Sequence, residues 1–229
     1  SKRYKELTKQ SIKGKKKIEL KDVIELVKKT STSKFDESID ISMRINLKQS
    51  KGGDFNLRTI VKLPNGSGKK IRVAVLCEAD KVEEAKMSGA DIFGTDDLIE
   101  KISTGKFDFD KLICTPAMMG KLGKHGKVLG PKGLMPNPKL GSVTMDVTAA
   151  VKAIKSGQVE FRVEKAGIIH AGIGKASFKE EDLFDNLSAF INSVSKARPT
   201  GAKGQFIKKV SISSSMGPAI KVDLNSLGI

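Results

Sequence analysis

The residues best suited to bind a charged partner lie in one stretch, residues 115–141, with the sequence TPAMMGKLGKHGKVLGPKGLMPNPKLG. It contains five lysines, no acidic residue and four of the chain's seven prolines. Its glycines let the backbone approach a ligand closely, and its lysines supply positive charge, a combination that suits contact with phosphates. The lysines that we single out for such a contact are Lys121, Lys124, Lys127 and Lys132.

No motif for nucleotide binding or catalysis is complete. Gly89 and Gly94 have the spacing of a phosphate-binding loop, but Thr95 stands where that loop needs lysine. The run GIGKAS at 172–177 lacks the third glycine of a dinucleotide fingerprint. The two histidines and two cysteines lack the paired spacing of zinc ligands. We therefore expect no enzymatic activity, no cofactor and no metal. The alternative, a phosphate-substrate enzyme with a basic cleft, would need a nucleotide loop or an acid–base pair.

The charge of the chain favours a polyanion as its partner. The 229 residues include 42 Lys and Arg against 26 Asp and Glu, which gives a formal net charge of +16. Nucleic acid is the common polyanion, because Lys and Arg displace the counterions of its phosphates. With no Trp and one Tyr, the chain suits the shape of folded RNA or a duplex better than base stacking along a single strand. A generic basic nucleic-acid-binding protein and a duplex-DNA regulator remain alternatives.

The sequence gives no sign of export or of a membrane span. No apolar run approaches the roughly 18 residues that cross a bilayer, and the first residues, SKRYK, lack the apolar stretch of a secretory signal. Two cysteines cannot build a disulfide framework, so we expect reduced thiols in a reducing compartment. We expect a cytoplasmic protein without a membrane partner.

The hydrophobic periodicity of the two ends of the chain differs from that of the middle. Both ends show strict alternation, typical of half-buried antiparallel strands, together with amphipathic helices. Glycines 52 and 53 suggest that the first two strands form a hairpin. The expected elements of these ends are helices near 20–27 and 183–194, and strands near 39–47, 55–63, 159–163, 206–212 and 219–224.

The middle of the chain is typical of a parallel α/β unit. The run IRVAVLC at 71–77 is nearly all apolar, as in a strand buried on both faces, and helices alternate with strands after it. We expect strands at 91–93 and 112–114 and helices at 80–88, 96–102 and 148–155. The predicted fold class is therefore α+β and α/β. A split α+β domain would be built from residues 1–66 and 159–229, with a three-layer α/β domain inserted at 67–158.

Three short segments of the chain ends look exposed and specific. SKFD at 33–36 puts an aromatic residue beside a cation at a helix–strand junction, although that Phe could equally cap the core. SSSMGP at 213–218 fills a turn between strands, where an ordinary hairpin would use Asn-Gly or Asp-Gly. KAGIIH at 165–170 forms a third polar edge. The candidates from these segments are Lys34, Phe35, Lys165, Gly167, His170, Ser215, Met216 and Gly217.

These motifs resemble the bacterial form of the ribosomal protein L1 family. The resemblance rests on the glycine- and lysine-rich stretch, whose GPKGLMPNPK is highly specific, and on GIIHAGIGKASF and SSSMGP. It includes the segments KFDESIDI and GAKGQFIKKV, and so covers essentially the whole chain.

The resemblance implies a function in the ribosome. It implies a split RNA-binding domain built from both termini and an inserted Rossmann-like domain that holds no nucleotide. It implies a structural protein of the large subunit that binds folded 23S rRNA and forms a mobile stalk beside the exit site for deacylated tRNA. Bacterial members also repress translation of their own operon through a similar fold in the mRNA leader. Other large-subunit components would be neighbours, and the free protein would be a monomer.

The resemblance also assigns roles to residues. The family's main RNA site corresponds here to Lys34, Phe35, Lys165 and the turn Ser215-Met216-Gly217, with Glu25 as a further carry-over. Many members have Thr where this chain has Ser215, so the hydroxyl is kept and a methyl group is lost. Hydroxyl and backbone groups in a rigid turn can recognise the 2′-OH that distinguishes RNA from DNA. We add Lys175 to this site, and expect Lys121, Lys124, Lys127 and Lys132 to meet a second RNA surface.

Overall fold

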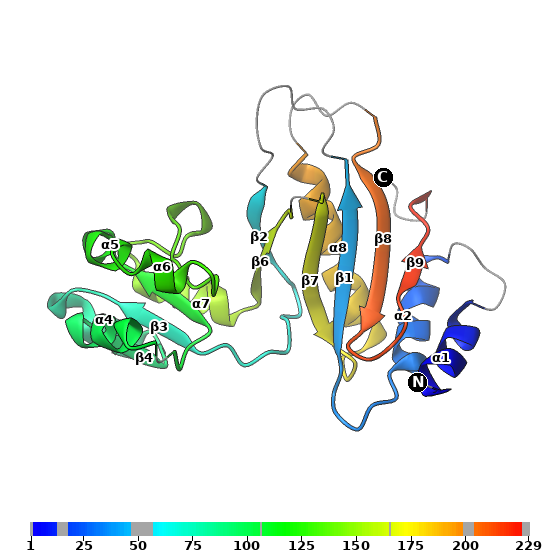
Figure 1. Cartoon of the computed structure of the whole chain (residues 1–229), viewed down its shortest axis with the longest axis horizontal. Coiled ribbons are helices and arrows are strands. Elements are labelled where there is room, and N and C mark those ends of the chain that lie inside the picture. The colour runs from blue at the N-terminus through cyan, green and yellow to red at the C-terminus, as the bar shows by residue number, and fades with distance from the viewer. Residues whose placement is uncertain are drawn as a thin grey trace. The chain divides into compact units, whose positions relative to one another are not determined.

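The computed structural model describes residues 2–12, 18–46, 57–105, 107–164, 166–198 and 204–225. The chain divides into two compact units (Figure 1): unit 1 is Ser1–Gly68 with Gly157–Ile229, and unit 2 is Lys69–Ser156. Helices and sheets are mixed throughout, which confirms the α+β character expected from the periodicity. Within the described ranges, no helix is long and apolar enough to cross a membrane.

Unit 1 is built on a four-stranded antiparallel sheet with the order β7-β1-β8-β9. In Figure 1, α2 and α8 lie on one face of this sheet, and no helix of the described residues covers the other face, which we call the open face. The strands are β1 (Ser38–Ile45), β7 (Ile168–Lys175), β8 (Ile207–Ser214) and β9 (Ile220–Val222), and the helices are α1 (Lys2–Ile12), α2 (Leu20–Thr30) and α8 (Glu180–Lys196).

One hydrophobic core joins the sheet to its helices. In β1 every second residue is buried, and Ile39, Ile41 and Met43 are at most 2% exposed. They share a cluster with the apolar stripes of α2 and α8, including the fully buried Phe190. Burying a side chain of this size contributes about 1.5–3 kcal/mol. Because successive residues of a strand point to opposite faces, this core also determines which residues of β1 face outward.

The expected hairpin between the first two strands is wrong. The second strand, β2 (Arg58–Lys62), pairs with β6 (Gln158–Arg162) in a separate two-stranded sheet, and β1 pairs with β7 and β8 instead. Alternation identifies a strand but carries no information about its partner, and here the partners lie about a hundred residues away in sequence or further. Glycines 52 and 53 lie outside the described residues.

Unit 2 contains the expected parallel sheet, in the order β4-β3-β5. Its strands are β3 (Val73–Leu76), β4 (Ile92–Gly94) and β5 (Lys111–Cys114). The helices are α3 (Val82–Met87), α4 (Asp96–Ser103), α5 (Pro116–Gly123), α6 (Gly126–Leu129) and α7 (Val147–Lys155), with 3₁₀ turns at Ala79–Lys81 and Pro138–Leu140. All four residues of β3 are buried, as the apolar run predicts.

Separate cores cover the two faces of this sheet. One contains Cys114 with residues of α4, α5 and α6, and the other contains Cys77 with residues of α3 and α7. Both thiols are buried, and burial raises the pKa of Cys114 to about 11. A thiol in such surroundings stays protonated at neutral pH, so these cysteines are core residues rather than nucleophiles.

The stretch 115–141, for which the hydrophobic periodicity predicts no helix, contains two short α-helices. Helix α5 starts directly after Thr115 with Pro116 at its first position, where the missing N–H leaves no helical hydrogen bond unmade. Met118 and Leu122 on α5 and Leu129 on α6 are buried in the core. These widely spaced apolar anchors hold the helices in place despite the glycines, which weaken the local helical signal.

Candidate nucleic-acid interface

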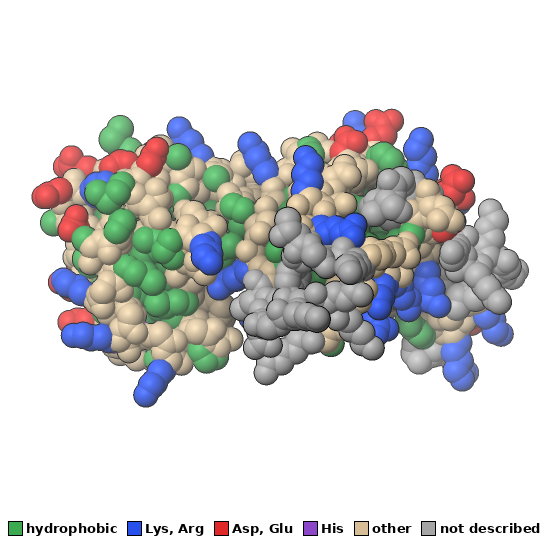
Figure 2. Space-filling model, turned by 90° about the horizontal axis from the view of Figure 1, so that it is seen from above, with side chains coloured by type: hydrophobic (Ala, Val, Ile, Leu, Met, Phe, Trp, Pro, Cys, Tyr) green, Lys and Arg blue, Asp and Glu red, His purple; other side chains and the backbone are tan. Residues whose placement is uncertain are grey.

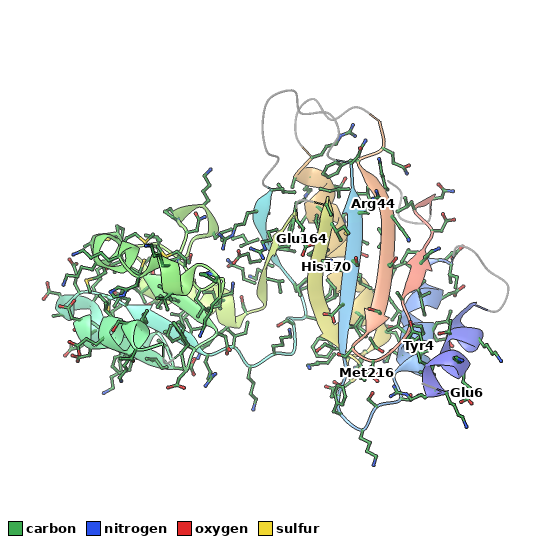
Figure 3. The ribbon with its side chains drawn as sticks, in the orientation of Figure 1. Tyr4, Glu6, Arg44, Glu164, His170 and Met216 are labelled. Carbon is green, nitrogen blue, oxygen red and sulfur yellow. The ribbon has the colours of Figure 1, made fainter. Side chains whose placement is uncertain are left out.

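The turn between β8 and β9 lies at the end of the sheet where β1 begins. Its Ser215 N–H donates to the Ser38 carbonyl at 3.0 Å, and the Ser38 N–H donates back to the Ser215 hydroxyl at 3.0 Å. The next residue, Met216, is 56% exposed and stands at this edge of unit 1 (Figure 3). The reciprocal hydrogen bonds hold the turn rigid, so an exposed hydroxyl, backbone and thioether are presented in one fixed arrangement.

Gly217 makes the turn possible. A Cβ atom added at this position would lie 2.4 Å from the Ser214 hydroxyl oxygen, closer than real contacts allow. Only glycine therefore fits without movement of a buried neighbour.

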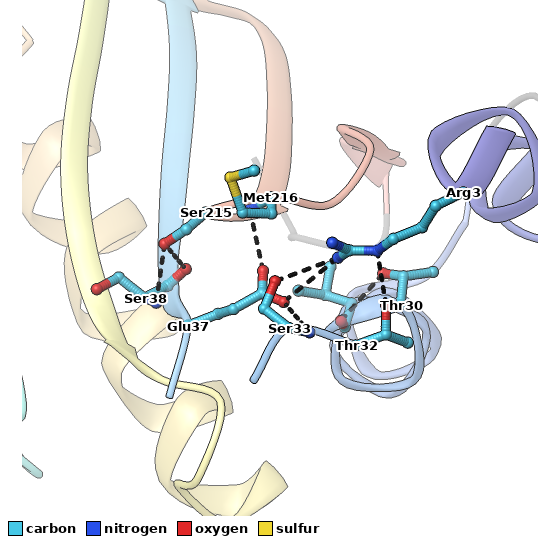
Figure 4. A network of polar contacts seen from close by, with 9 residues as sticks. Arg3, Thr30, Thr32, Ser33, Glu37, Ser38, Ser215 and Met216 are labelled. Atoms are coloured by element: carbon cyan, nitrogen blue, oxygen red, sulfur yellow. Dashed lines mark hydrogen bonds and ion pairs between the residues drawn. The ribbon is translucent and has the colours of Figure 1, made fainter. Parts of the chain in front are cut away.

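A buried carboxylate joins this turn to the loop before β1 (Figure 4). The Glu37 side chain has no exposed surface, and its oxygens accept the N–H groups of Met216 at 2.9 Å and Ser33 at 3.0 Å. Burial alone would raise the pKa of Glu37, but the hydrogen bonds, with that from Met216 the strongest, lower it to about 2. Glu37 is therefore an ionised anchor that fixes two segments far apart in sequence.

The loop before β1 presents Phe35 to solvent. Phe35 is 57% exposed, which excludes the interpretation of this residue as a cap on the core. It lies between Lys34, also exposed, and Asp36, whose carboxylate accepts the Ser177 N–H at 3.1 Å and hydroxyl at 2.9 Å. Exposing an aromatic ring to water is unfavourable, and the hydrogen bonds of this loop keep Phe35 exposed. An exposed ring of this kind suits contact with a base or sugar.

Helix α1 contacts the same loop through Arg3. Its guanidinium donates to the Thr32 hydroxyl at 3.0 Å and the Ser33 hydroxyl at 3.2 Å, and lies 3.8 Å from Glu37 (Figure 4). The structure makes residues 2–12 a helix that belongs to this site.

The open face of the sheet continues from the turn. Cross-strand partners point to the same face, so Ser42 of β1 lies between His170 of β7 and Ser211 of β8, away from the helices. One pair further, Arg44 lies opposite Lys209. His170 and Arg44 are exposed and follow one another up this face in Figure 3. His170 is thus about 13 Å along the strand from the turn, at 3.3 Å per residue.

Other predicted site residues have different positions. Gly167 is buried in the bend between β6 and β7, with a positive φ of 74°, and its carbonyl accepts the Ile45 N–H at 2.8 Å. Lys175 donates to the Ser38 hydroxyl at 2.9 Å, next to the turn. Glu25 lies on α2 and bonds Lys29. Lys165 lies outside the described residues.

The four lysines singled out in unit 2 are not equivalent. Lys121 forms an ion pair with Asp96 at 2.8 Å, and Lys132 lies 3.9 Å from the ring centroid of Phe107. Lys124 and Lys127 are exposed where α5 meets α6. Figure 2 shows Lys and Arg side chains protruding over the visible face, with hydrophobic side chains between them on unit 2. Across the described part of the chain, no group of three or more His, Cys, Asp or Glu side chains could hold a metal ion.

Sequence comparison assigns the chain to a known family. The family model described as Ribosomal protein L1p/L10e family matches residues 27–218. The chain belongs to this family. The match confirms the resemblance carried by the motifs, and it spans all of unit 2, the loop with Phe35, and the turn with Met216.

Membership in the L1p/L10e family makes the chain an RNA-associated protein of the large ribosomal subunit. The family consists of structural ribosomal proteins and is not known for enzymes. Helix α1 with Arg3 precedes the matched residues, so its contact with the site is a feature that the family match does not cover.

Sequence reasoning missed Glu37 and Arg3. Glu37 does not stand out in the sequence, because it is one of 26 acidic residues and directly follows Asp36. Arg3 does not stand out either, because nine of the first 21 residues are basic.

Proposed function

We propose that unit 1 is the RNA-binding domain and binds a folded segment of 23S rRNA through the turn at 215–217, Phe35 and Lys34. The observation that carries this proposal is the pair of exposed apolar side chains, Phe35 and Met216, on two segments fastened to one buried carboxylate. The aromatic ring of Phe35 and the thioether of Met216 can pack against the sugars and bases of folded RNA, while the neighbouring hydroxyl and backbone groups can form hydrogen bonds with it. The open sheet face with His170 and Arg44 extends the surface.

We further propose that unit 2 is an inserted domain with a second RNA contact at Lys124 and Lys127. On the cytoplasmic ribosome, the protein would then form the mobile stalk beside the tRNA exit site and aid release of deacylated tRNA. A leader of its own mRNA that copies the rRNA fold would occupy the same site in unit 1. Binding of that leader would repress translation of the operon.

The test is a binding titration over a range of salt concentrations. The ligands are the stalk fragment of 23S rRNA, a scrambled RNA and a duplex DNA of equal length. We expect the stalk fragment to stay bound at salt concentrations that release both controls, because phosphate contacts alone weaken steeply with salt. If all three ligands are released together, the chain offers only a generic polyanion surface and the proposal fails.

The site assignment is tested by two variants with matched controls. Phe35→Ala should weaken binding of the stalk fragment about five- to a hundredfold, since stacking of a base on an aromatic side chain contributes about 1–3 kcal/mol. Met216→Ala should also weaken binding, because it removes the exposed thioether of the turn. Met87→Ala and Phe93→Ala remove the same exposed side-chain types from unit 2 and should leave affinity unchanged. Circular dichroism verifies that all four variants fold. Unchanged affinity in both site variants would contradict the assignment.

A further inference from the structure

Unit 1 has a groove in its helix layer, away from the open sheet face. The groove lies between α2 and the first turns of α8 and has a volume of about 340 Å³. Its lining residues are Lys21, Ile24, Glu180, Glu181, Phe184 and Asp185.

The floor of the groove is apolar. Ile24 is 3% exposed and belongs to the unit 1 core, and Phe184 packs partly buried against that core. A side chain entering the groove would therefore meet hydrocarbon and the face of an aromatic ring. Such a floor stabilises an apolar or aromatic anchor.

The rim of the groove is acidic. Three of its lining residues are the exposed carboxylates Glu180, Glu181 and Asp185, against one cation, Lys21. The charge of these lining residues is thus opposite in sign to the net charge of +16 on the chain, and Lys29 of α2 also lies near Glu180. Acidic residues in the first turn favour the start of α8 through the helix dipole, but this does not account for the apolar opening beside them. RNA phosphates would be repelled here, and cations attracted.

One cation already occupies the groove. The Lys21 ammonium lies 5.8 Å from the ring centroid of Phe184. A cation over an aromatic face is an attractive arrangement, and it is the arrangement that an incoming Lys or Arg would make. Lys21 would compete with such a ligand.

We propose that this groove docks a basic segment of a partner protein. An aromatic or aliphatic side chain of that segment would rest on Ile24 and Phe184, and flanking Lys or Arg residues would pair with Glu181 and Asp185. Charge complementarity selects this occupant over RNA. The site does not depend on the proposed RNA surface, which lies on other residues, so unit 1 could hold RNA and a protein neighbour together.

The test uses the full chain and an acetylated, amidated pentapeptide of sequence KRWKR. The chain has no Trp, so the peptide's Trp fluorescence reports binding without background. We expect saturable binding that Glu181→Gln with Asp185→Asn weakens about four- to twentyfold, since each exposed pair contributes up to about 1 kcal/mol. Lys21→Met should tighten binding, because it removes the competing cation and keeps the hydrocarbon stem.

The control double variant, Asp97→Asn with Glu100→Gln, removes the same charge from exposed positions of α4 in unit 2 and should bind the peptide like wild type. An unlabelled KRGKR peptide should compete poorly, because it lacks the anchor. Equal loss of affinity in both double variants, or equal competition by KRGKR, would show charge attraction without a groove and overturn the proposal. So would loss of rRNA binding in the groove variant, which would assign these carboxylates to the RNA surface.

Discussion

Glu37 couples the position of the β8–β9 turn to a single charge. Its carboxylate accepts from Met216 and Ser33, and Arg3 lies nearby. A buried acceptor that receives several N–H groups is a stronger constraint than any one hydrogen bond, because losing it would leave more than one partly buried donor without its partner. The exposed residues that would contact RNA are thus positioned by one that would not.

We expect Glu37→Gln to destabilise the fold by about 1–3 kcal/mol and to weaken RNA binding, because the amide offers one oxygen where the carboxylate offers two. The pKa of Glu37 is lowered from 4.5 to about 2. Its stabilisation, about 3 kcal/mol, is therefore complete above about pH 4.5 and is lost as the pH falls towards 2. Urea unfolding measured between pH 2 and 6 checks this. Wild type should lose more stability across that window than Glu37→Gln, whereas the exposed control Glu83→Gln should follow wild type. Parallel profiles for all three proteins would contradict the role of Glu37.

We expect the substitution of glycine by alanine to have opposite effects on stability at two positions. Gly217→Ala should lower stability by about 1–3 kcal/mol and reduce RNA affinity, because the new methyl group would overlap the buried Ser214 hydroxyl. Gly120→Ala lies in helix α5 with open space around it and should raise stability by about 0.5–1 kcal/mol. Thermal melts and RNA titrations of both variants measure the difference. A neutral Gly217→Ala would mean that the turn can relax, and that its rigidity does not set the affinity.

For individual residues, the sequence predicts the exposed side chains of the site better than it predicts the residues that position them. Phe35 and Met216 stand out as apolar side chains among turn-forming neighbours, and both are exposed. Glu37 and Arg3 depend on three segments that meet only in the folded chain: α1, the loop before β1, and the β8–β9 turn. No local pattern contains that information.

The elements themselves were predictable because each has a local cause. Alternation identified β1, β6 and β8, continuous burial identified β3, and helical spacing identified α2 and α8. The pairing of β1 was not predictable, because its partners β7 and β8 both lie in the last third of the chain, far from β1 in sequence. Helices α5 and α6 were missed because their apolar anchors are sparse and their glycines favour loops.

Across the whole molecule, charge is distributed unevenly between the units. Residues 69–156 contain 15 basic and 11 acidic residues, so +12 of the net charge of +16 belongs to unit 1. Long-range attraction of RNA is therefore mainly a property of unit 1. Any contribution of unit 2 to RNA affinity must therefore come from the positions of individual lysines, and this can be tested.

Salt dependence separates local contact from general charge in unit 2. Lys124→Gln with Lys127→Gln should reduce the slope of log affinity against log salt by about 1.4–1.8, because each phosphate contact contributes about 0.7–0.9. The matched pair Lys86→Gln and Lys152→Gln removes the same charge from α3 and α7, which cover the other face of the same sheet, and should change the slope little. Titration of the 23S stalk fragment from low to high salt measures both. Equal slopes for the two double variants would mean that unit 2 contributes charge but no defined contact, and that recognition is confined to unit 1.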